Sequence, residues 1–306
     1  MTAIGAEEKA AVMRVMDSGV LSGFLAGGLH GGPEVNALEE EWANYFGFKH
    51  AIAMNSATSC LIAACGAVGV RAGDYVAVPP LTMSASATCM MPWGGKPIFI
   101  DIEPDYFCLD VEMYSRFQFN GACTAVITVD IFGQASNEAL RDAAQGIPII
   151  QDASQRPIPG GFGDIVVYSL NYHKHIHCGE GGVACTNSDV YAERLRLIRN
   201  HAECAADNTV LYGFNFRMTE IEAAIARVQL TKLPGEIKRR QELAKTIPNL
   251  APARPTAEHA WYLFPHTEQV TGSAKYSKPL YTLPIFRSHP LPNTEAVWEA
   301  LWMTRP

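Results

Sequence analysis

The sequence has little of the basic charge that a nucleic-acid-binding protein needs. Charged residues make up 18% of the 306 residues, and 31 acidic side chains against 24 basic ones give a net charge of −7 at pH 7. Coating a nucleic acid requires a broad basic face that displaces counterions. We therefore expect no nucleic-acid partner, and any phosphate that the protein binds must be held by local groups.

Long, uniformly apolar runs are also missing. Residues 51–70 and 75–95 carry no charge, but the first stretch contains Asn55 and several hydroxyl residues, and the second contains three prolines. Neither is the apolar span of about 20 residues that a bilayer demands. The N-terminal residues are acidic where an export signal would need a basic stretch followed by an apolar one. We expect no membrane partner and a cytoplasmic location.

The eight cysteines lack the close pairing of zinc knuckles, and most lie inside apolar runs, so we expect reduced thiols in the core. They are Cys60, Cys65, Cys89, Cys108, Cys123, Cys178, Cys185 and Cys204. His173, His175 and His177 alternate, but no Cys or carboxylate set with ligand spacing accompanies them. The sequence therefore predicts no metal site.

Short apolar runs alternate with helical patterns along most of the chain. Strands without polar alternation, separated by helices, indicate a mainly parallel sheet covered on both faces, which is an α/β fold. The predicted strands are HAIAM, YVAVP, KPIFIDI, TAVITVD, IPIIQD, DIVVYSL and GGVACTN. Helical patterns also cover residues 6–19, 34–46 and 219–233. After Pro248 the prolines become frequent, and we predict a large domain over residues 1–233 and a small C-terminal α+β domain over residues 234–306.

A lysine follows one of the predicted strands. In SLNYHKHIHCGEGG, residues 169–182, Lys174 lies just beyond DIVVY, between aromatic and imidazole neighbours and ahead of a glycine-rich turn. In that setting an amine can lose its proton and become a nucleophile. An arbitrary lysine in such a loop is simply a surface residue, so Lys174 needs support from other features.

Two further features give that support. Asp152 ends the apolar run IPIIQD, and a buried carboxylate there implies a cationic partner, either an arginine or the protonated ring nitrogen of a cofactor. In HAIAMNSATSCL a strand runs into a helix with small hydroxyl residues at the junction, where backbone amides and the helix dipole can hold a phosphate. The same residues also suit an ordinary N-cap.

A phosphate seat, a carboxylate and an activatable lysine, in this order, match the needs of pyridoxal 5′-phosphate (PLP): an anchor, a partner for the pyridine nitrogen and an amine for a Schiff base. From about residue 20 to residue 233 the sequence resembles the DegT/DnrJ/EryC1/StrS family of sugar aminotransferases. The segments that carry the resemblance, in family order, are LSGF with GGPEV, NSATSCL, VAVPPLTMSASA, KPIFIDIEPDYFCLD, IFGQ, QDASQ, SLNYHKHIHCGEGG and GFNFRMTEIEAAIARVQLTKL.

The resemblance implies the fold of aspartate-aminotransferase type (fold type I), with a mostly parallel seven-stranded sheet in the large domain. It also implies transfer of an amino group, with glutamate as the expected donor, to a ketosugar carried on a nucleotide. A homodimer with the cofactor at its interface is expected as well.

Residue by residue, Lys174 matches the family lysine that forms the Schiff base, and Asp152 matches the acid that pairs with the pyridine nitrogen. Gln155 matches the residue near the cofactor's phenolic oxygen. Met83 stands where the family usually has an aromatic side chain on the pyridine ring, and its thioether can still pack against a π face.

The phosphate contacts follow in the same way. Ala57, Thr58 and Ser169 match positions around the phosphate, and Asn215 in GFNFRM matches a residue that reaches the phosphate from the neighbouring subunit. Thr219 and Glu222, just after it, are spaced as a capping box that starts a helix.

Two alternatives stay open at this point. The first is another enzyme on the same scaffold, either a dehydratase, which Lys174 disfavours, or an aromatizing enzyme of the aminohydroxybenzoate synthase kind. The second is a non-catalytic PLP-binding regulatory protein, suggested by Met83 and by a C-terminal region that is short for the family. Turnover with an amino donor separates the second class from an enzyme.

Overall fold

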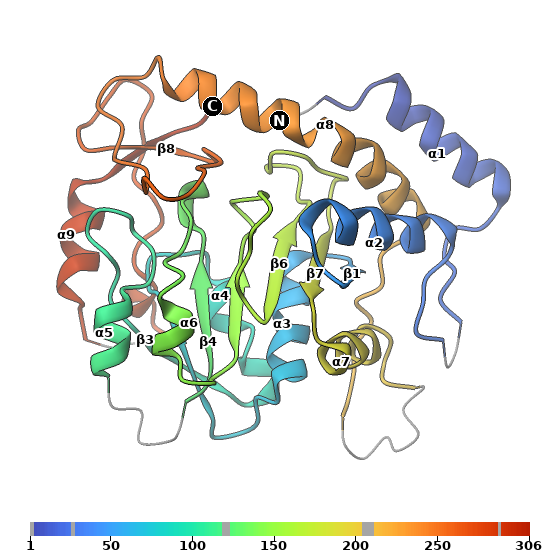
Figure 1. Cartoon of the computed structure of the whole chain (residues 1–306), viewed down its shortest axis with the longest axis horizontal. Coiled ribbons are helices and arrows are strands. Elements are labelled where there is room, and N and C mark those ends of the chain that lie inside the picture. The colour runs from blue at the N-terminus through green and yellow to red at the C-terminus, as the bar shows by residue number, and fades with distance from the viewer. Residues whose placement is uncertain (1–2, 26–27, 118–122, 204–210, 287–288) are drawn as a thin grey trace. The chain divides into compact units, whose positions relative to one another are not determined.

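The computed structural model in Figure 1 describes residues 3–25, 28–117, 123–203, 211–286 and 289–306. Seven strands form one sheet in the order β1-β7-β6-β5-β4-β2-β3, and β8 and β9 form a second, two-stranded sheet near the C-terminus. β2 pairs in parallel with β3 and β4, and β4 with β5, whereas β7 is antiparallel to β1 and β6. The predicted α/β fold with a mostly parallel seven-stranded sheet is confirmed.

The chain divides into two compact units, residues 1–69 with 159–236 and residues 70–158 with 237–306. The elements that begin in the first unit are α1 (Ala6–Ser18), α2 (Pro33–Phe46), β1 (His50–Met54), α3 (Ala57–Val68), β6 (Ile165–Ser169), β7 (Gly182–Thr186), α7 (Asp189–Arg199) and α8 (Glu220–Ala244). α3 and α7 pack against each other and against β1 and β7 (Figure 1). From α2, Trp42 and Phe46 pack against the buried ring of Tyr168 in β6.

The second unit contains the remaining strands and shorter helices. Its elements are β2 (Tyr75–Val78), α4 (Ala85–Thr88), η1 (Met91–Trp93), β3 (Lys96–Phe99), α5 (Val111–Arg116), β4 (Cys123–Val129), η2 (Ile131–Gly133), α6 (Leu140–Ala143), β5 (Ile149–Asp152), β8 (Phe264–His266), η3 (Leu280–Thr282), α9 (Pro292–Ala300) and β9 (Trp302–Thr304). β4 and β5 are buried almost throughout, as a strand must be when both faces of its sheet are covered. All seven predicted strands of the main sheet are present.

Helix α8 extends further than the sequence pattern indicates. We expect the helix to stop at Leu233 and the basic run 238–240 to form a solvated face, but α8 continues through Pro234 to Ala244. Ile237, Arg240 and Ala244 are buried at helical spacing, and the Arg240 guanidinium donates to the carbonyls of Trp261 and Tyr262. Burial of this face stabilises the extra turns. The division into domains 1–233 and 234–306 stays a prediction.

The seven cysteines that lie within the described residues are all buried and form no disulfide bond, and Cys204 lies outside the described residues. In that same part of the chain, no helix is both long enough and apolar enough to cross a bilayer.

Candidate active site

The first turn of α3 is built to receive an anion. Ser56 is the N-cap, and its hydroxyl accepts a hydrogen bond of 3.0 Å from the amide of Ser59. The amides of Ala57 and Thr58, which come before it, have no partner within the helix, as is general for the first turn. No acidic residue lies in this turn, so the positive end of the helix dipole is not compensated. Ala57 and Thr58 are both half-buried.

Strand β7 brings Ser169 to the same place. Gly182 begins β7 and pairs with Ser169, the last residue of β6. A Cβ atom on Gly182 would lie only 2.4 Å from the backbone nitrogen of Ala57, so only glycine allows β7 to approach the start of α3 so closely. The structure therefore brings Ala57, Thr58 and Ser169 close together, and their role as a phosphate seat stays a prediction.

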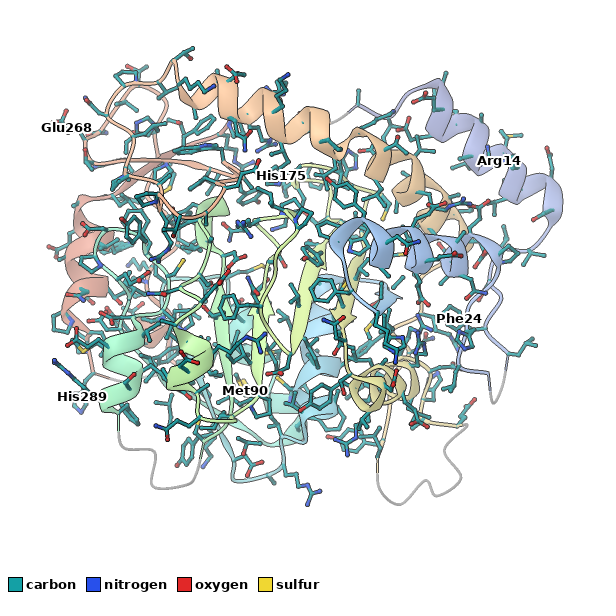
Figure 2. The ribbon with its side chains drawn as sticks, viewed as in Figure 1. Arg14, Phe24, Met90, His175, Glu268 and His289 are labelled. Carbon is teal, nitrogen blue, oxygen red and sulfur yellow. The ribbon has the colours of Figure 1, made fainter. Side chains whose placement is uncertain are left out.

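Lys174 lies in the loop between β6 and β7, directly after this seat (Figure 1). The Ser169 hydroxyl accepts from the amide of Asn171 at 3.3 Å, and the side-chain and backbone oxygens of Asn171 accept from the amides of His173 and Lys174 at 3.1 and 2.9 Å. His175, the next residue in the chain and labelled in Figure 2, is fully buried. The half-buried Lys174 is thus held by a tight turn rather than on a free surface loop. Asn171, which we do not single out from the sequence, organises that turn.

Asp152 ends β5 in the second unit and is only 6% exposed. Its carboxylate accepts a hydrogen bond of 2.9 Å from the hydroxyl of Ser86 and one of 3.1 Å from the amide of Ser154. Both donors are neutral, and among the described residues of this unit no lysine, arginine or histidine forms an ion pair with Asp152. The nearest arginine in sequence, Arg156, faces Asp130 instead, at 3.9 Å. The negative charge of Asp152 is therefore left without a cationic partner from its own unit.

Met83 lies close to Asp152 through a short turn. The amide of Ser86 donates to the carbonyl of Met83 at 3.2 Å, while the Ser86 hydroxyl donates to Asp152 and also contacts Thr82. The Met83 side chain is 59% exposed. A large apolar side chain that is exposed beside a buried carboxylate is suited to cover a planar ligand.

Gln155 is buried in the same unit, and its Oε1 atom accepts 2.7 Å from the amide of Phe132. Tyr276, from the C-terminal part of the chain, lies near the same side chain, which acts to lower the pKa of the Tyr276 hydroxyl. Sequence reasoning misses Tyr276, because no local motif marks it and Gln155 is far away in the sequence. Ser86 links Met83 and Asp152, and Gln155 is buried in the same unit; that the three residues form one site stays a prediction.

Asn215 is set apart from these groups. It lies in a short extended segment, between Phe214 and Phe216 in the sequence, and the rings of these two residues stack on each other. The carbonyl of Phe216 accepts a hydrogen bond of 2.9 Å from the amide of Asn55. The Asn215 side chain is exposed. The segment thus runs beside the strand–helix junction of the phosphate seat, but the role predicted for Asn215 concerns a second chain.

Comparison with known proteins gives a consistent result. A model of the DegT/DnrJ/EryC1/StrS aminotransferase family matches residues 2–267. The chain is 31% identical over 297 residues to the spore coat polysaccharide biosynthesis protein SpsC of Bacillus subtilis (strain 168), over 85% of this chain and 73% of that protein. It is also 31% identical over 226 residues to GDP-perosamine synthase of Vibrio cholerae, over 70% of this chain and 61% of that protein.

Solved structures agree with this. DesV of S. venezuelae, crystallised with a ketimine intermediate, matches with a TM-score of 0.87 and 26% identity, over 98% of this chain and 89% of that one. The fold expected from the resemblance and the assignment as an aminotransferase are thereby confirmed. The family match covers most of the sequence, including every segment singled out above, and this chain belongs to the DegT/DnrJ/EryC1/StrS aminotransferase family.

Proposed function

We propose that this protein uses PLP to transfer an amino group, with glutamate as the donor, to a ketosugar carried on a nucleotide. The observation that carries the proposal is the state of Asp152, a buried carboxylate with two neutral donors and, among the described residues of its own unit, no cationic partner. Burying such a charge is costly unless a cation compensates it. A protonated pyridine nitrogen supplies that cation.

The phosphate seat supports the same cofactor. The first-turn amides of α3 and the hydroxyl of Ser169 are donors that a phosphate group needs, and the glycine at position 182 lets β7 bring Ser169 close to them. The residues present therefore fit PLP. That the phosphate seat in the first unit and Asp152 in the second serve one cofactor is part of the proposal.

When bound, PLP supplies an electron sink that stabilises negative charge on the α-carbon of an amino acid. In the proposed reaction, Nζ of Lys174 takes a proton from the α-carbon of the donor and later returns one on the acceptor side. Asp152 holds a proton on the pyridine nitrogen, and Met83 covers the ring. Gln155 donates to the phenolic oxygen, while Ala57, Thr58 and Ser169 hold the phosphate.

The substrate class draws on the relatives. The Vibrio cholerae relative is named as a synthase of GDP-perosamine, an amino sugar linked to a nucleotide, and SpsC is named as a spore coat polysaccharide biosynthesis protein. We extend this substrate class to the present chain on the basis of 31% identity, and we take glutamate as the donor from the family resemblance. The expected cytoplasmic location stays a prediction.

We further propose that the active form is a homodimer in which Asn215 of one chain reaches the phosphate held by the other. The exposure of Asn215 beside the phosphate seat supports this role. Asn215→Ala is expected to weaken cofactor retention without lowering the thermal unfolding temperature of the cofactor-free protein. An active monomer in light scattering at assay concentration would refute the shared site.

The function is tested in two separate half-reactions. Protein loaded with PLP is mixed with glutamate alone, which is expected to change the visible spectrum and to release 2-oxoglutarate. A nucleotide ketosugar added afterwards is expected to restore the spectrum and to yield an aminosugar. Borohydride is expected to fix the cofactor to a peptide that contains Lys174, and Lys174→Ala is expected to bind cofactor without turnover.

The alternatives have their own outcomes in this experiment. If no common amino acid changes the spectrum while a sugar is dehydrated or aromatized, another enzyme on the same scaffold replaces the aminotransferase of the proposal. If neither reaction occurs and PLP stays bound, the protein has a regulatory role. Borohydride labelling of a different lysine would refute the assignment of Lys174.

A further inference from the structure

Tyr276 meets the candidate site from the C-terminal part of the second unit. Its ring packs edge-on against Phe132, with centroids 5.0 Å apart and an interplanar angle of 87°. The backbone amide of Phe132 donates to Oε1 of Gln155 at 2.7 Å, and the hydroxyl of Tyr276 is close enough to the same glutamine side chain for that side chain to lower its pKa. Phe132 therefore contacts both Gln155 and the ring of Tyr276.

These contacts fix the orientation of the Gln155 amide. Because an N–H of the backbone can only donate, the atom of Gln155 that faces Phe132 must be the carbonyl oxygen. Nε2, which carries two hydrogens, is then the donor end of this amide. One hydrogen is available to the oxygen of Tyr276 and the other to a ligand.

The segments that hold these groups are themselves anchored. Phe132 has a positive φ of 60°, which is uncommon for an aromatic residue, and its carbonyl accepts 2.8 Å from the amide of Tyr262. Two residues before Tyr276, the backbone of Ala274 exchanges hydrogen bonds of 3.0 and 2.8 Å with Met303. Fixed backbone on both sides allows a hydroxyl group to set the direction of an amide.

The charge state of Tyr276 suits this role. Burial raises the pKa of its hydroxyl well above the ordinary value for tyrosine; Gln155 acts to lower it, and Tyr262 and Asp152 act to raise it. Since Asp152 contributes, the hydroxyl also lies within electrostatic reach of the carboxylate assigned to the pyridine nitrogen. Tyr276 therefore stays a neutral hydroxyl over the working pH range.

We propose that Tyr276 is a positioning residue of the active site: its hydroxyl oxygen accepts from Nε2 of Gln155, so that the second N–H of that amide donates to the phenolic oxygen of PLP. The inference rests on the proposed function, which places Gln155 beside that oxygen. It gives the C-terminal region a task in cofactor binding even though this region is short.

The test compares Tyr276→Phe with Tyr281→Phe in the full-length protein. Phenylalanine at position 276 keeps the ring that packs on Phe132 and removes only the hydroxyl. Tyr281 is a matched control, because it is buried in the same unit and its hydroxyl donates to Glu295 instead, at 2.6 Å. PLP affinity is measured by equilibrium dialysis, and the visible spectrum of the loaded protein is titrated with pH.

For Tyr276→Phe we expect the dissociation constant for PLP to rise about three- to tenfold, as for the loss of one neutral hydrogen bond. The pH midpoint of the spectral change is expected to rise, because a well-aligned donor favours the deprotonated phenolic oxygen and this variant misaligns it. Tyr281→Phe is expected to match the wild type in both measurements. Since Tyr276 acts through Gln155, the double variant Tyr276→Phe/Gln155→Ala is expected to equal Gln155→Ala alone.

Three results would overturn the inference. One is wild-type affinity and midpoint in Tyr276→Phe while Gln155→Ala changes both, which would leave Tyr276 a packing residue only. Another is strict additivity in the double variant. Failure of the wild-type protein to bind PLP would refute the proposed function and the inference with it, whereas the first two results leave the proposed function intact.

Discussion

Two buried carboxylates lie at the ends of neighbouring strands of the second unit: Asp130 follows β4, and Asp152 is the last residue of β5. They differ in the groups that compensate their negative charge. The amide of Asp130 donates to the carbonyl of Asp152 at 3.0 Å, so their backbones touch. Asp130 is fully buried and accepts from Ser136 and from Gln151, with the Arg156 guanidinium 3.9 Å away. In the described part of the chain, Asp152 accepts from two neutral donors, Ser86 and Ser154.

The difference separates a structural carboxylate from a functional one. Burial raises the pKa of Asp130 above its ordinary value, and Arg156, Ser136 and Gln151 offset part of that rise, so the protein itself supplies a cation and hydrogen-bond donors around this carboxylate. Among the residues that the structure describes in this unit, none supplies the corresponding cation to Asp152, although Arg156 is only four residues further along the chain. A carboxylate that is buried and left in this state is expected to be completed by a ligand.

The largest expected effect is on catalysis, from Asp152→Asn. Turnover is expected to fall about a thousandfold, since the amide cannot hold a proton on the pyridine nitrogen. The free energy of unfolding of the cofactor-free protein is expected to stay the same or to rise, because a buried charge without a counterion is removed. Steady-state kinetics and urea unfolding measure the two quantities. Loss of several kcal/mol of stability would make Asp152 a structural residue like Asp130.

The converse is expected for Asp130→Asn. Removing this carboxylate leaves the buried Arg156 without its counter-charge, so we expect the free energy of unfolding to fall by about 3 kcal/mol. The double variant Asp130→Asn/Arg156→Met removes both charges and is expected to recover much of that loss. If the single variant unfolds at the same urea concentration as the wild type, the contrast between the two carboxylates does not hold.

Met83 tests the same contrast through ligand binding. If the pyridine ring of PLP compensates the charge of Asp152, the exposed thioether of Met83 gains contact area with that ring. Met83→Ala is then expected to raise the dissociation constant for PLP about fivefold. Met83→Phe is expected to be tolerated or to tighten binding. Met91, another exposed methionine of this unit, is a matched control for the alanine variant. Unchanged affinity in both Met83 variants would show that the residue does not face the ring.

The smallest effect is expected in the first unit, where the buried carboxylate of Glu8 is compensated by the protein. Burial acts to raise the pKa of Glu8, but Lys232, the amide of Gly5 and Gln229 outweigh it and lower that pKa from 4.5 to about 2. Because the folded-state pKa is the lower one, this stabilisation is complete above pH 4.5 and is lost as the pH falls toward 2.

Lys232→Met tests this dependence. The variant is expected to be less stable than the wild type at pH 7 and to lose less stability between pH 5 and pH 3, as followed by urea unfolding. Lys245→Met is the control, since Lys245 pairs with Glu242 on an exposed surface and such pairs contribute little. Parallel stability curves for wild type and Lys232→Met would contradict the assigned cause.

Much of the fold could be predicted because its strands are continuous apolar runs, and such runs follow directly from burial on both faces. Helix α5 is missed because it has six residues and buries only Tyr114, which is too little for a periodicity. Its one local sign is Asp110, which caps the amides of Glu112 and Met113. The continuation of α8 past Pro234 depends on burial of Arg240, which no local pattern reveals.

The candidate site divides in a similar way. Lys174 and Asp152 follow predicted strands and stand out in the sequence, whereas Tyr276 reaches Gln155 only through tertiary packing. The sequence also leaves two cationic partners open for Asp152. Arg156 is engaged by Asp130 and by the carbonyl of Glu258 at 2.9 Å, and the proposed function assigns the cofactor as the partner of Asp152.

In the proposed site, the carboxylate of Asp152 compensates the positive charge of the protonated ring nitrogen of PLP. The most direct measurement is the ¹⁵N NMR chemical shift of PLP labelled at that nitrogen and bound to the full-length protein, in the wild type and in Asp152→Asn. A protonated nitrogen in the wild type at pH 8 and an unprotonated one in the variant are the predicted result. An unprotonated nitrogen in the wild type, or the same shift in both proteins, would contradict the account.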